Sequence, residues 1–426
     1  MNNLFYLDYA SLFRILRDRL AEPAPSRIQL LSGPRQVGKT SLLTSLAQDF
    51  GNRAIYVSLD GPEASIAGFW ERLWADAERL ATEQKTKAER ERSGGDSIIV
   101  FLDEIQQLPD WSARLKGEWD RIKRENLPIH VVASGSSSLA LGAGSKESLA
   151  GRFERLTLPH WTPAALAQAF DMNKDDAIDT YVSQGAYPGS MGLRNDANPQ
   201  RFLAYLREAI IEPAIGRDIL SLEAVRRPAL LRQVFAIAVT IPAQVISLQK
   251  LQGQLQDKGA LATIAHYLDL LEDAFLIAPL HKFTNRPLRQ REAPPKIVVL
   301  NNALCAALDR RPVPTLATDP QRYGHWVENA CLARLWNQGI PLFYWRESGL
   351  EVDAVIDNGE SKWAIEVKTG SFGPADLAGL FEFTRQYPEF RPLLLCGGDG
   401  LIAAKRFGIQ AQAWRDFLWQ GLPTVQ

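Results

Sequence analysis

Cysteine is scarce in this sequence, and its few copies are far apart. Only three occur in 426 residues, Cys305, Cys331 and Cys396, and no two form a CxxC pair. Disulfide frameworks and zinc sites need several cysteines at short spacings. The sequence therefore argues against both, and we expect the three thiols to be buried as small apolar groups.

The chain also lacks an excess of charge and a long hydrophobic run. Its formal net charge is -1, so a surface for nucleic acid would have to be a local patch. The most apolar run, residues 234–246, has about half the length that spans a bilayer and contains Pro242. The N-terminal sequence has no basic stretch followed by an apolar core, as a signal peptide would. We expect a soluble, cytoplasmic protein with no membrane partner.

Several domains are expected from the length, because 426 residues exceed what one compact core usually holds. Residues 9–20 carry apolar side chains at helical spacing. Four short apolar runs, typical of buried strands, alternate with helical stretches at residues 27–33, 54–60, 97–104 and 129–136. This alternation predicts an α/β fold with a parallel sheet and helices on both faces.

One glycine-rich segment has the composition of a phosphate-binding loop. The residues are Gly33, Pro34, Arg35, Gln36, Val37, Gly38, Lys39 and Thr40, followed by Ser41, and they match GxxxxGK[ST] at every defining position. Glycines let backbone N–H groups approach phosphate oxygens, and the helix that follows directs its positive end at the same anion. Lys39 is expected to reach the β- and γ-phosphates and Thr40 to ligate Mg²⁺, which predicts ATP and Mg²⁺ as cofactors.

A buried run at residues 98–102 ends in two carboxylates, Asp103 and Glu104. Ligands of parallel sheets bind at the carboxyl ends of the strands. Asp103 is expected to hold the magnesium through its water shell, and Glu104 to polarise the attacking water. The alternative is an acidic strand end that only caps a turn.

Three further polar residues are candidates for contact with the phosphates. Ser134 and Ser136 follow the fourth apolar run and could sense the γ-phosphate, or belong to a serine-rich loop that caps the next helix. Arg152 could place its guanidinium on the transferred phosphate, within one chain or across a subunit boundary. A surface ion pair is the alternative for Arg152.

The segments GPRQVGKTSLL, IIVFLDEIQQLPDW and VVASGSSSLALGAGSKESLAGRFERLTL resemble the AAA-type ATPases of bacteria and archaea that carry a C-terminal domain of unknown function. The resemblance continues to the segment ending in WAIEVKTG. It implies an ATPase core at residues 1–160, a helical connector at 161–225, a winged-helix-like part at 226–315 and a restriction-nuclease-like part at 316–426. Relatives usually carry an aspartate after the strand at KIVVL, where this chain has Asn301 and Asn302, so a role for that acid is in doubt.

The expected winged-helix-like part has helical stretches at 228–240, 247–256 and 261–276, followed by a hairpin. The third stretch is more acidic than basic, which disfavours contact with phosphates. The hairpin is more basic, and we expect any DNA contact there, from Lys282, Arg286, Arg289, Arg291 and Lys296. Packing or subunit contact without DNA is the alternative.

Glu328, Asp353, Glu366 and Lys368 follow the order E…D…ExK, which is similar to the PD-(D/E)XK nuclease pattern. Residues two apart on a strand face the same side, so Glu366 and Lys368 should lie together. Three carboxylates would bind Mg²⁺, and Lys368 would orient the water. A nuclease-like scaffold with these residues in salt bridges is the alternative.

The sequence thus favours an ATP-hydrolysing machine whose C-terminal half contacts DNA or another macromolecule. An ATP-gated, metal-dependent nuclease is one alternative. The other is a regulatory scaffold in which slow ATP turnover times assembly with a protein partner. A homo-oligomer is compatible with all three.

Overall fold

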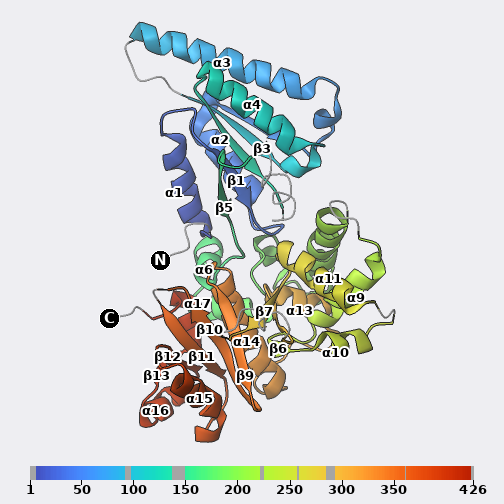
Figure 1. Cartoon of the computed structure of the whole chain (residues 1–426), viewed down its shortest axis with the longest axis vertical. Helices are drawn as coiled ribbons and strands as arrows, with labels where there is room; N and C mark the ends of the chain where they lie inside the picture. The colour runs from blue at the N-terminus through green and yellow to red at the C-terminus, as the bar shows by residue number, and fades with distance from the viewer. Residues whose placement is uncertain are drawn as a thin grey trace. The chain divides into compact units, whose positions relative to one another are not determined.

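The chain forms two compact units in the computed structural model, which describes residues 6–91, 97–136, 149–220, 225–256, 259–284, 293–359 and 361–423 (Figure 1). Leu4–Pro159 form the N-terminal unit, and His160–Gln426 form the body of the C-terminal unit. The division lies close to residue 160, where the expected ATPase core ends.

A five-stranded parallel sheet forms the centre of the N-terminal unit. Its strands are β1 (Ile28–Ser32), β2 (Ala54–Ser58), β3 (Ile98–Asp103), β4 (Ile129–Ser134) and β5 (Phe153–Thr157). Their order across the sheet is β2-β3-β4-β1-β5, so β4 lies between β1 and β3. The carboxyl ends of β1, β4 and β3 therefore adjoin at one edge of the sheet.

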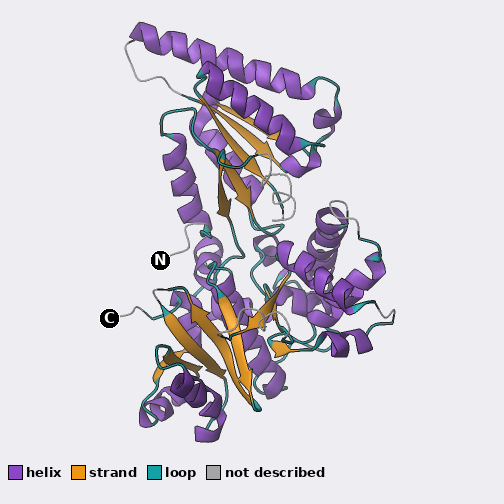
Figure 2. Cartoon of the chain, viewed as in Figure 1, coloured by secondary structure: helices purple, strands orange, loops and turns teal. Residues whose placement is uncertain are grey.

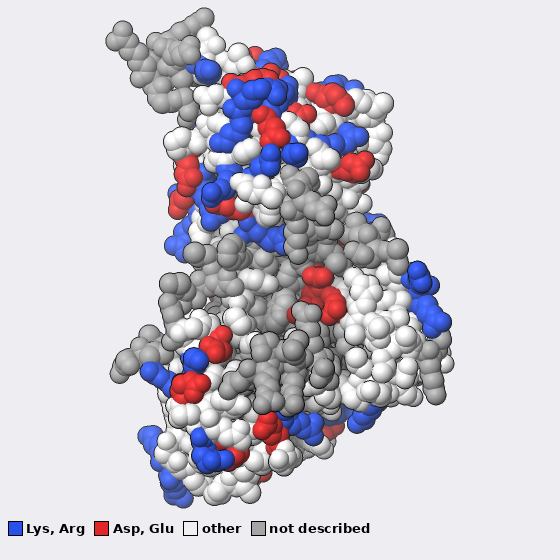
Figure 3. Space-filling model, viewed as in Figure 1, with Lys and Arg blue, Asp and Glu red and all other residues white. Residues whose placement is uncertain are grey.

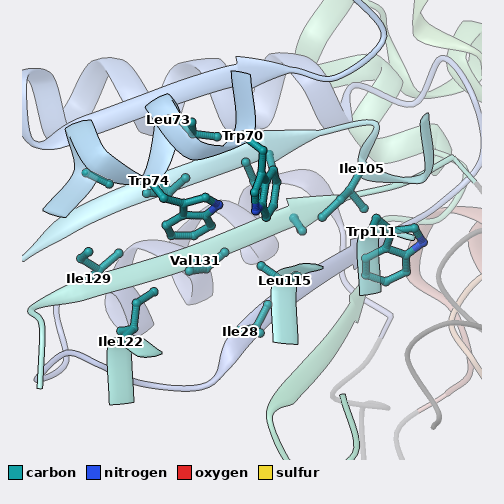
Figure 4. Close-up of a cluster of buried hydrophobic side chains, with 14 of the residues drawn as sticks. Ile28, Trp70, Leu73, Trp74, Ile105, Trp111, Leu115, Ile122, Ile129 and Val131 are labelled. Atoms are coloured by element: carbon teal, nitrogen blue, oxygen red, sulfur yellow. The ribbon is translucent and has the colours of Figure 1, made fainter. Parts of the chain in front are cut away.

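Helices cover both faces of this sheet, which confirms the predicted α/β class (Figure 2). They are α1 (Tyr9–Leu20), α2 (Lys39–Phe50), α3 (Phe69–Glu91) and α4 (Trp111–Glu125). Alternate strand residues face opposite sides. On one side, Ile28 and Val131 join Trp70 and Trp74 of α3 and Leu115 of α4 in a buried cluster (Figure 4).

The C-terminal unit begins with helices and ends with alternating strands and helices. Its helices are α6 (Pro163–Phe170), α7 (Lys174–Ser183), α8 (Pro199–Tyr205), α9 (Pro228–Ala238), α10 (Leu248–Gly253), α11 (Leu261–Asp273), α13 (Asn302–Leu308), α14 (Pro320–Trp336), α15 (Ala378–Gln386), α16 (Gly398–Arg406) and α17 (Trp414–Gln420). Helices α9, α10 and α11 lie where the sequence pattern predicts three helical stretches.

An eight-stranded mixed sheet runs through the C-terminal unit in the order β13-β12-β11-β10-β9-β7-β8-β6. The strands are β6 (Gln244–Val245), β7 (Ile277–Lys282), β8 (Lys296–Val299), β9 (Leu342–Glu347), β10 (Leu350–Asp357), β11 (Lys362–Lys368), β12 (Arg391–Cys396) and β13 (Gln410–Ala413). Strands β7 and β8 form an antiparallel pair, and β7 also pairs with β9 in parallel. The expected winged-helix-like and nuclease-like parts therefore share one sheet.

Two smaller expectations concern apolar residues. The three cysteines are buried and free, as predicted. Within the described ranges, no helix combines the length and the apolar character that a bilayer crossing requires.

Candidate functional site

The glycine-rich segment forms the turn between β1 and α2. Two of its glycines have positive φ, 154° at Gly33 and 98° at Gly38. A Cβ atom at Gly33 would lie 2.1 Å from the carbonyl oxygen of Leu158. Only glycine is therefore compatible with this approach of the loop to the chain that follows β5.

The loop places its lysine inward and its hydroxyl residues outward. Lys39 is 5% exposed, and its Nζ donates hydrogen bonds to the carbonyl oxygens of Gly33, at 2.9 Å, and Pro34, at 2.7 Å. Val37 is fully buried, whereas Thr40 and Ser41 are exposed at the start of α2. The ammonium is thus held within the turn that the loop makes.

Asp103, at the end of β3, is the centre of a hydrogen-bond network. Its Oδ2 accepts hydrogen bonds from Thr40 Oγ1, at 2.7 Å, and from the hydroxyl of Tyr56 on β2, at 2.9 Å. Its Oδ1 accepts from Ser134 at the end of β4. Burial, followed by the charge of Asp103, raises the pKa of the Tyr56 phenol, so Tyr56 stays a proton donor.

Glu104 has a positive φ of 53°, a backbone conformation that carries its side chain out of the strand direction. Its backbone N–H donates to Ser134 Oγ at 3.3 Å. The amide of Gln106 donates to Glu104 Oε2 and, at 3.1 Å, to Ser136 Oγ. One buried glutamine thus links the second carboxylate to the serine-containing end of β4.

Two of these residues were not anticipated from the sequence. Tyr56 carries no local signal, because only the pairing of β2 with β3 brings it to Asp103. Gln106 follows Glu104 closely, and a polar side chain next to a catalytic candidate is the signal that could have found it. The remaining serines of the segment, Ser137 and Ser138, lie outside the described residues.

Arg152 does not lie near the phosphate loop of its own chain. Its carbonyl oxygen accepts a hydrogen bond from the N–H of Ile28, at the amino end of β1, whereas the loop follows the carboxyl end. Its guanidinium is ion-paired with Asp120 at 2.9 Å and stacks on Trp119. The expectation that Arg152 acts within one chain is therefore wrong, because a strand length separates it from the loop.

The C-terminal unit brings the E…D…ExK residues together around a further lysine. Glu328 on α14 and Asp353 on β10 both contact the ammonium of Lys296 on β8, at 2.5 and 3.0 Å. On β11, Lys368 is 2.7 Å from Glu366. The described residues contain no group of three or more Asp, Glu, His or Cys side chains arranged to hold a metal ion.

These charges perturb one another strongly. Burial alone would lower the pKa of Lys296, but Asp353, Glu328 and Glu351 outweigh it and raise that pKa well above its usual value. Burial and the charge of Asp353 raise the pKa of Glu366. Burial would also raise the pKa of Asp353, but the charges of Lys296 and Lys368 lower it instead.

Two of the five basic residues expected to contact DNA at the hairpin are engaged within the protein. Lys296 is fully buried, so the expectation that it meets DNA phosphates is wrong. Lys282 lies 3.5 Å from Glu347. Arg286, Arg289 and Arg291 lie outside the described residues.

Asn301 and Asn302, which follow β8, take part in a buried polar network. Asn301 Oδ1 accepts hydrogen bonds from the N–H groups of Ala186, at 3.0 Å, and Ala303, at 3.2 Å. Asn302 Nδ2 donates to the carbonyl oxygens of Val182 and Trp326. Both asparagines therefore serve packing within the C-terminal unit.

Three family models match successive parts of the chain. Residues 25–164 match an AAA domain, residues 175–315 match a domain of unknown function (DUF8612), and residues 323–413 match another (DUF4143). The sheet order and the phosphate-type loop agree with the first match. The N-terminal unit therefore has the fold of an AAA-type P-loop ATPase.

Relatives along most of the chain are uncharacterised proteins. One from Mycobacterium tuberculosis is 29% identical over 353 residues, which cover 81% of this chain and 70% of that protein. One from Haemophilus influenzae is 20% identical over 348 residues, covering 80% and 82%.

Among solved structures, RuvB of Thermotoga maritima is 18% identical with a TM-score of 0.32, covering 64% of this chain and 87% of that one. The ORC1 protein of Aeropyrum pernix in complex with DNA is 18% identical with a TM-score of 0.27, covering 72% and 92%.

Proposed function

We propose that the N-terminal unit binds ATP with Mg²⁺ and hydrolyses it. The observation that carries this proposal is the contact of Thr40 Oγ1 with Asp103 Oδ2 at 2.7 Å, next to a loop that only glycine permits. A hydroxyl and a carboxylate from separate segments thus meet at the carboxyl edge of the sheet. Oxygen ligands of these two kinds suit Mg²⁺, which would neutralise charge on the β- and γ-phosphates.

The parts of the loop then have distinct roles in binding the nucleotide. Backbone N–H groups between Gly33 and Gly38 bind phosphate oxygens, and the N-terminal end of α2 adds its positive dipole. Lys39 exchanges the two carbonyl oxygens that it now contacts for phosphate oxygens, which are stronger acceptors because they are charged. Thr40 and Asp103 hold the metal side of the nucleotide.

In the hydrolytic step, Glu104 is the residue that acts on the attacking water. Its carboxylate accepts a proton from, or orients, the water that attacks the γ-phosphate. Gln106 fixes this carboxylate through its amide, and Ser134 fixes the backbone of Glu104 while it also donates to Asp103. Ser134 and Ser136 are thus proposed to position the two carboxylates, and the γ-phosphate contact expected for them stays a prediction.

Steady-state ATP hydrolysis by the purified full chain tests this assignment. Lys39→Ala should abolish both binding and turnover, whereas Glu104→Gln should retain ATP binding and lose turnover by at least about 100-fold. Lys85→Ala, at an exposed lysine of α3, is the matched control and should behave as wild type. Full turnover in Glu104→Gln would remove the proposed role of Glu104.

For Arg152, only a contribution to a neighbouring subunit remains as a proposal. The ion pair between Arg152 and Asp120 would have to break when the chain forms an oligomer. Arg152→Ala should then lower turnover only under conditions where the chain self-associates. An unchanged turnover number in the associated state would remove this role.

The C-terminal unit is proposed to contact a macromolecular partner whose engagement is controlled by the ATPase. Its winged-helix-like element order supports this, since such modules serve as contact surfaces. The described part of the hairpin and the helix before it offer DNA little positive charge, because Lys282 is paired, Lys296 is buried and α11 ends in Glu272 and Asp273. Figure 3 shows Lys and Arg close to Asp and Glu over much of the visible face, with one group of basic side chains standing alone at the right edge.

ATP turnover with and without nucleic acids separates the two classes of partner. The panel contains duplex, single-stranded and branched DNA at two salt concentrations. Stimulation that falls steeply with salt identifies DNA as the partner. Turnover unchanged by every nucleic acid removes DNA as the partner that controls the ATPase and favours a protein partner.

A further inference from the structure

The side chain of Lys296 lies in the middle of the acidic cluster in the C-terminal unit. It is 0% exposed, and its Nζ lies 2.5 Å from Glu328, 3.0 Å from Asp353 and 3.2 Å from Glu351. These three carboxylates come from α14 and from two positions on β10, whereas the lysine comes from β8. The ammonium therefore connects three elements that are distant in sequence.

We propose that the ammonium of Lys296 is a built-in cation that fills the position a divalent metal would take, so that the nuclease-like cluster binds no metal and cuts no nucleic acid. An ammonium and a hard divalent cation seek the same oxygen ligands. Here the covalently attached cation is already in contact with the carboxylates that a metal would need.

The contacts of the individual oxygens support this assignment. Asp353 Oδ1 accepts a hydrogen bond from Lys296 Nζ, and Asp353 Oδ2 accepts one from the N–H of Val367 at 2.9 Å. Glu366 is held by Lys368 at 2.7 Å. Both oxygens of Asp353 are thus engaged with groups of the protein, and Glu366 Oε1 is engaged with Lys368, whereas Glu366 Oε2 is buried without a hydrogen-bond partner. A metal would therefore have to displace the Lys296 ammonium to reach Asp353.

Burial makes the arrangement hard to open. A lysine with no exposed surface stays charged only if carboxylates compensate it, and three carboxylates within 3.2 Å of the Lys296 ammonium raise its pKa. A metal could enter only if the Lys296 ammonium and its four-carbon stem left the interior. The ammonium would then lose the carboxylates that compensate its charge. The cluster is therefore closed as long as Lys296 is present.

The inference extends beyond ATP hydrolysis and stands independently of it, because the cluster lies wholly within the C-terminal unit. It assigns the E…D…ExK residues to holding β8, α14 and β10 together. It also explains why this cluster carries two lysines, of which the sequence pattern contains only Lys368.

Binding of Mn²⁺ to the full chain without nucleotide, followed by the electron paramagnetic resonance of free Mn²⁺, tests the proposal. Wild type and Asp353→Asn should bind the same amount of Mn²⁺, because the cluster contributes none. Lys296→Ala should gain about one binding site, and Mn²⁺ should raise its melting temperature by about 5 °C or more. The double variant Lys296→Met with Glu328→Gln removes one charge of each sign, and it should fold without gaining this site.

Three results would overturn the proposal. One is a Mn²⁺ site in wild type that Asp353→Asn abolishes. Another is a folded Lys296→Ala that gains no metal. The third needs no lysine variant: cleavage of plasmid or branched DNA by wild type with Mg²⁺ or Mn²⁺ that is lost in Lys368→Ala.

Discussion

Asp103 illustrates how a single residue depends on three segments of chain. Its carboxylate accepts from Thr40, Tyr56 and Ser134, which come from α2, β2 and β4. Such a network positions charge without a long flexible side chain, so little reorganisation is needed when a ligand arrives. The same logic applies to Glu104, whose carboxylate is held by Gln106.

Replacing Gln106 by leucine should lower the turnover number about tenfold while the KM for ATP stays within about twofold. The leucine keeps the volume but cannot donate to Glu104 Oε2, so the catalytic carboxylate loses its orientation. Steady-state kinetics at saturating ATP measure the effect. Gln107→Leu, at the exposed neighbouring position, is the control, and an equal loss in both variants would contradict the positioning role.

Glu272, near the end of α11, makes stability depend on pH. Burial, followed by the charges of Asp273 and Asp269, raises its pKa from 4.5 to about 7. The stability that a carboxyl group with a raised pKa contributes is fully present below its unfolded pKa and is lost as pH rises through the folded value. Wild type should therefore become less stable between about pH 5 and pH 7.

The variant Glu272→Gln should be more stable than wild type at pH 8 by roughly 1–2 kcal/mol, with little difference at pH 4.5. Urea unfolding at both values measures this, with Glu389→Gln at an exposed position as control. A stability difference that does not change with pH would show that Glu272 carries no such linkage.

At the residue scale, contiguous residues of the sequence predict the glycine-rich loop and Asp103, and the structure brings Thr40 of this loop into contact with Asp103, while their roles stay predictions. Tyr56 and Lys296 could not be predicted, since each reaches its partner only through strand pairing or long-range packing. Lys296 illustrates the limit most clearly. Its position among other basic residues of a hairpin predicts contact with DNA, whereas the fold buries its side chain completely.

At the scale of elements, strands buried on both faces are the easiest to predict. The apolar runs of β1, β3 and β4 are fully buried, as their composition indicates. Strand β5 was missed because it lies at the sheet edge and is half-exposed, with Glu154 paired to Arg19 and Arg27. An edge strand that contains charged residues has no continuous hydrophobic run, so a prediction based on such runs does not find it.

The connection of the loop to the strand at this edge predicts the effect of Gly33→Ala. The added Cβ would lie 2.1 Å from the carbonyl oxygen of Leu158 and would require a strained φ. Stability should fall by roughly 2–4 kcal/mol, with loss of ATP binding. Gly117→Ala on α4 meets nothing within 4 Å and should leave stability unchanged or raise it by up to about 1 kcal/mol. Equal stability of both variants in urea unfolding would contradict the packing seen at the loop.

At the scale of the whole molecule, the chain forms two compact units, and the finer division of the C-terminal unit stays a prediction. The segments expected to be winged-helix-like and nuclease-like share one sheet through the pairing of β7 with β9, a long-range contact that no local pattern encodes. The N-terminal unit ends at Pro159, and the parallel α/β pattern of the sequence ends there too.

Two units with separate cores should unfold in two steps. Differential scanning calorimetry of the full chain should show two transitions, and ATP analogue with Mg²⁺ should raise only one of them, by several degrees at about 100 times the Kd. Lys39→Ala should abolish this shift and keep both transitions. A single transition that moves as a whole would indicate that the units unfold together.

The central claim is that the loop at Gly33–Lys39 holds a polyphosphate whose metal faces Asp103. A crystal structure of the chain with a non-hydrolysable ATP analogue and Mg²⁺ tests it most directly. We expect Lys39 Nζ to leave the carbonyl oxygens of Gly33 and Pro34 for the β- and γ-phosphates, with Thr40 and Asp103 on the metal side. A nucleotide bound elsewhere, or a metal with Asp103 turned away from it, would contradict the claim.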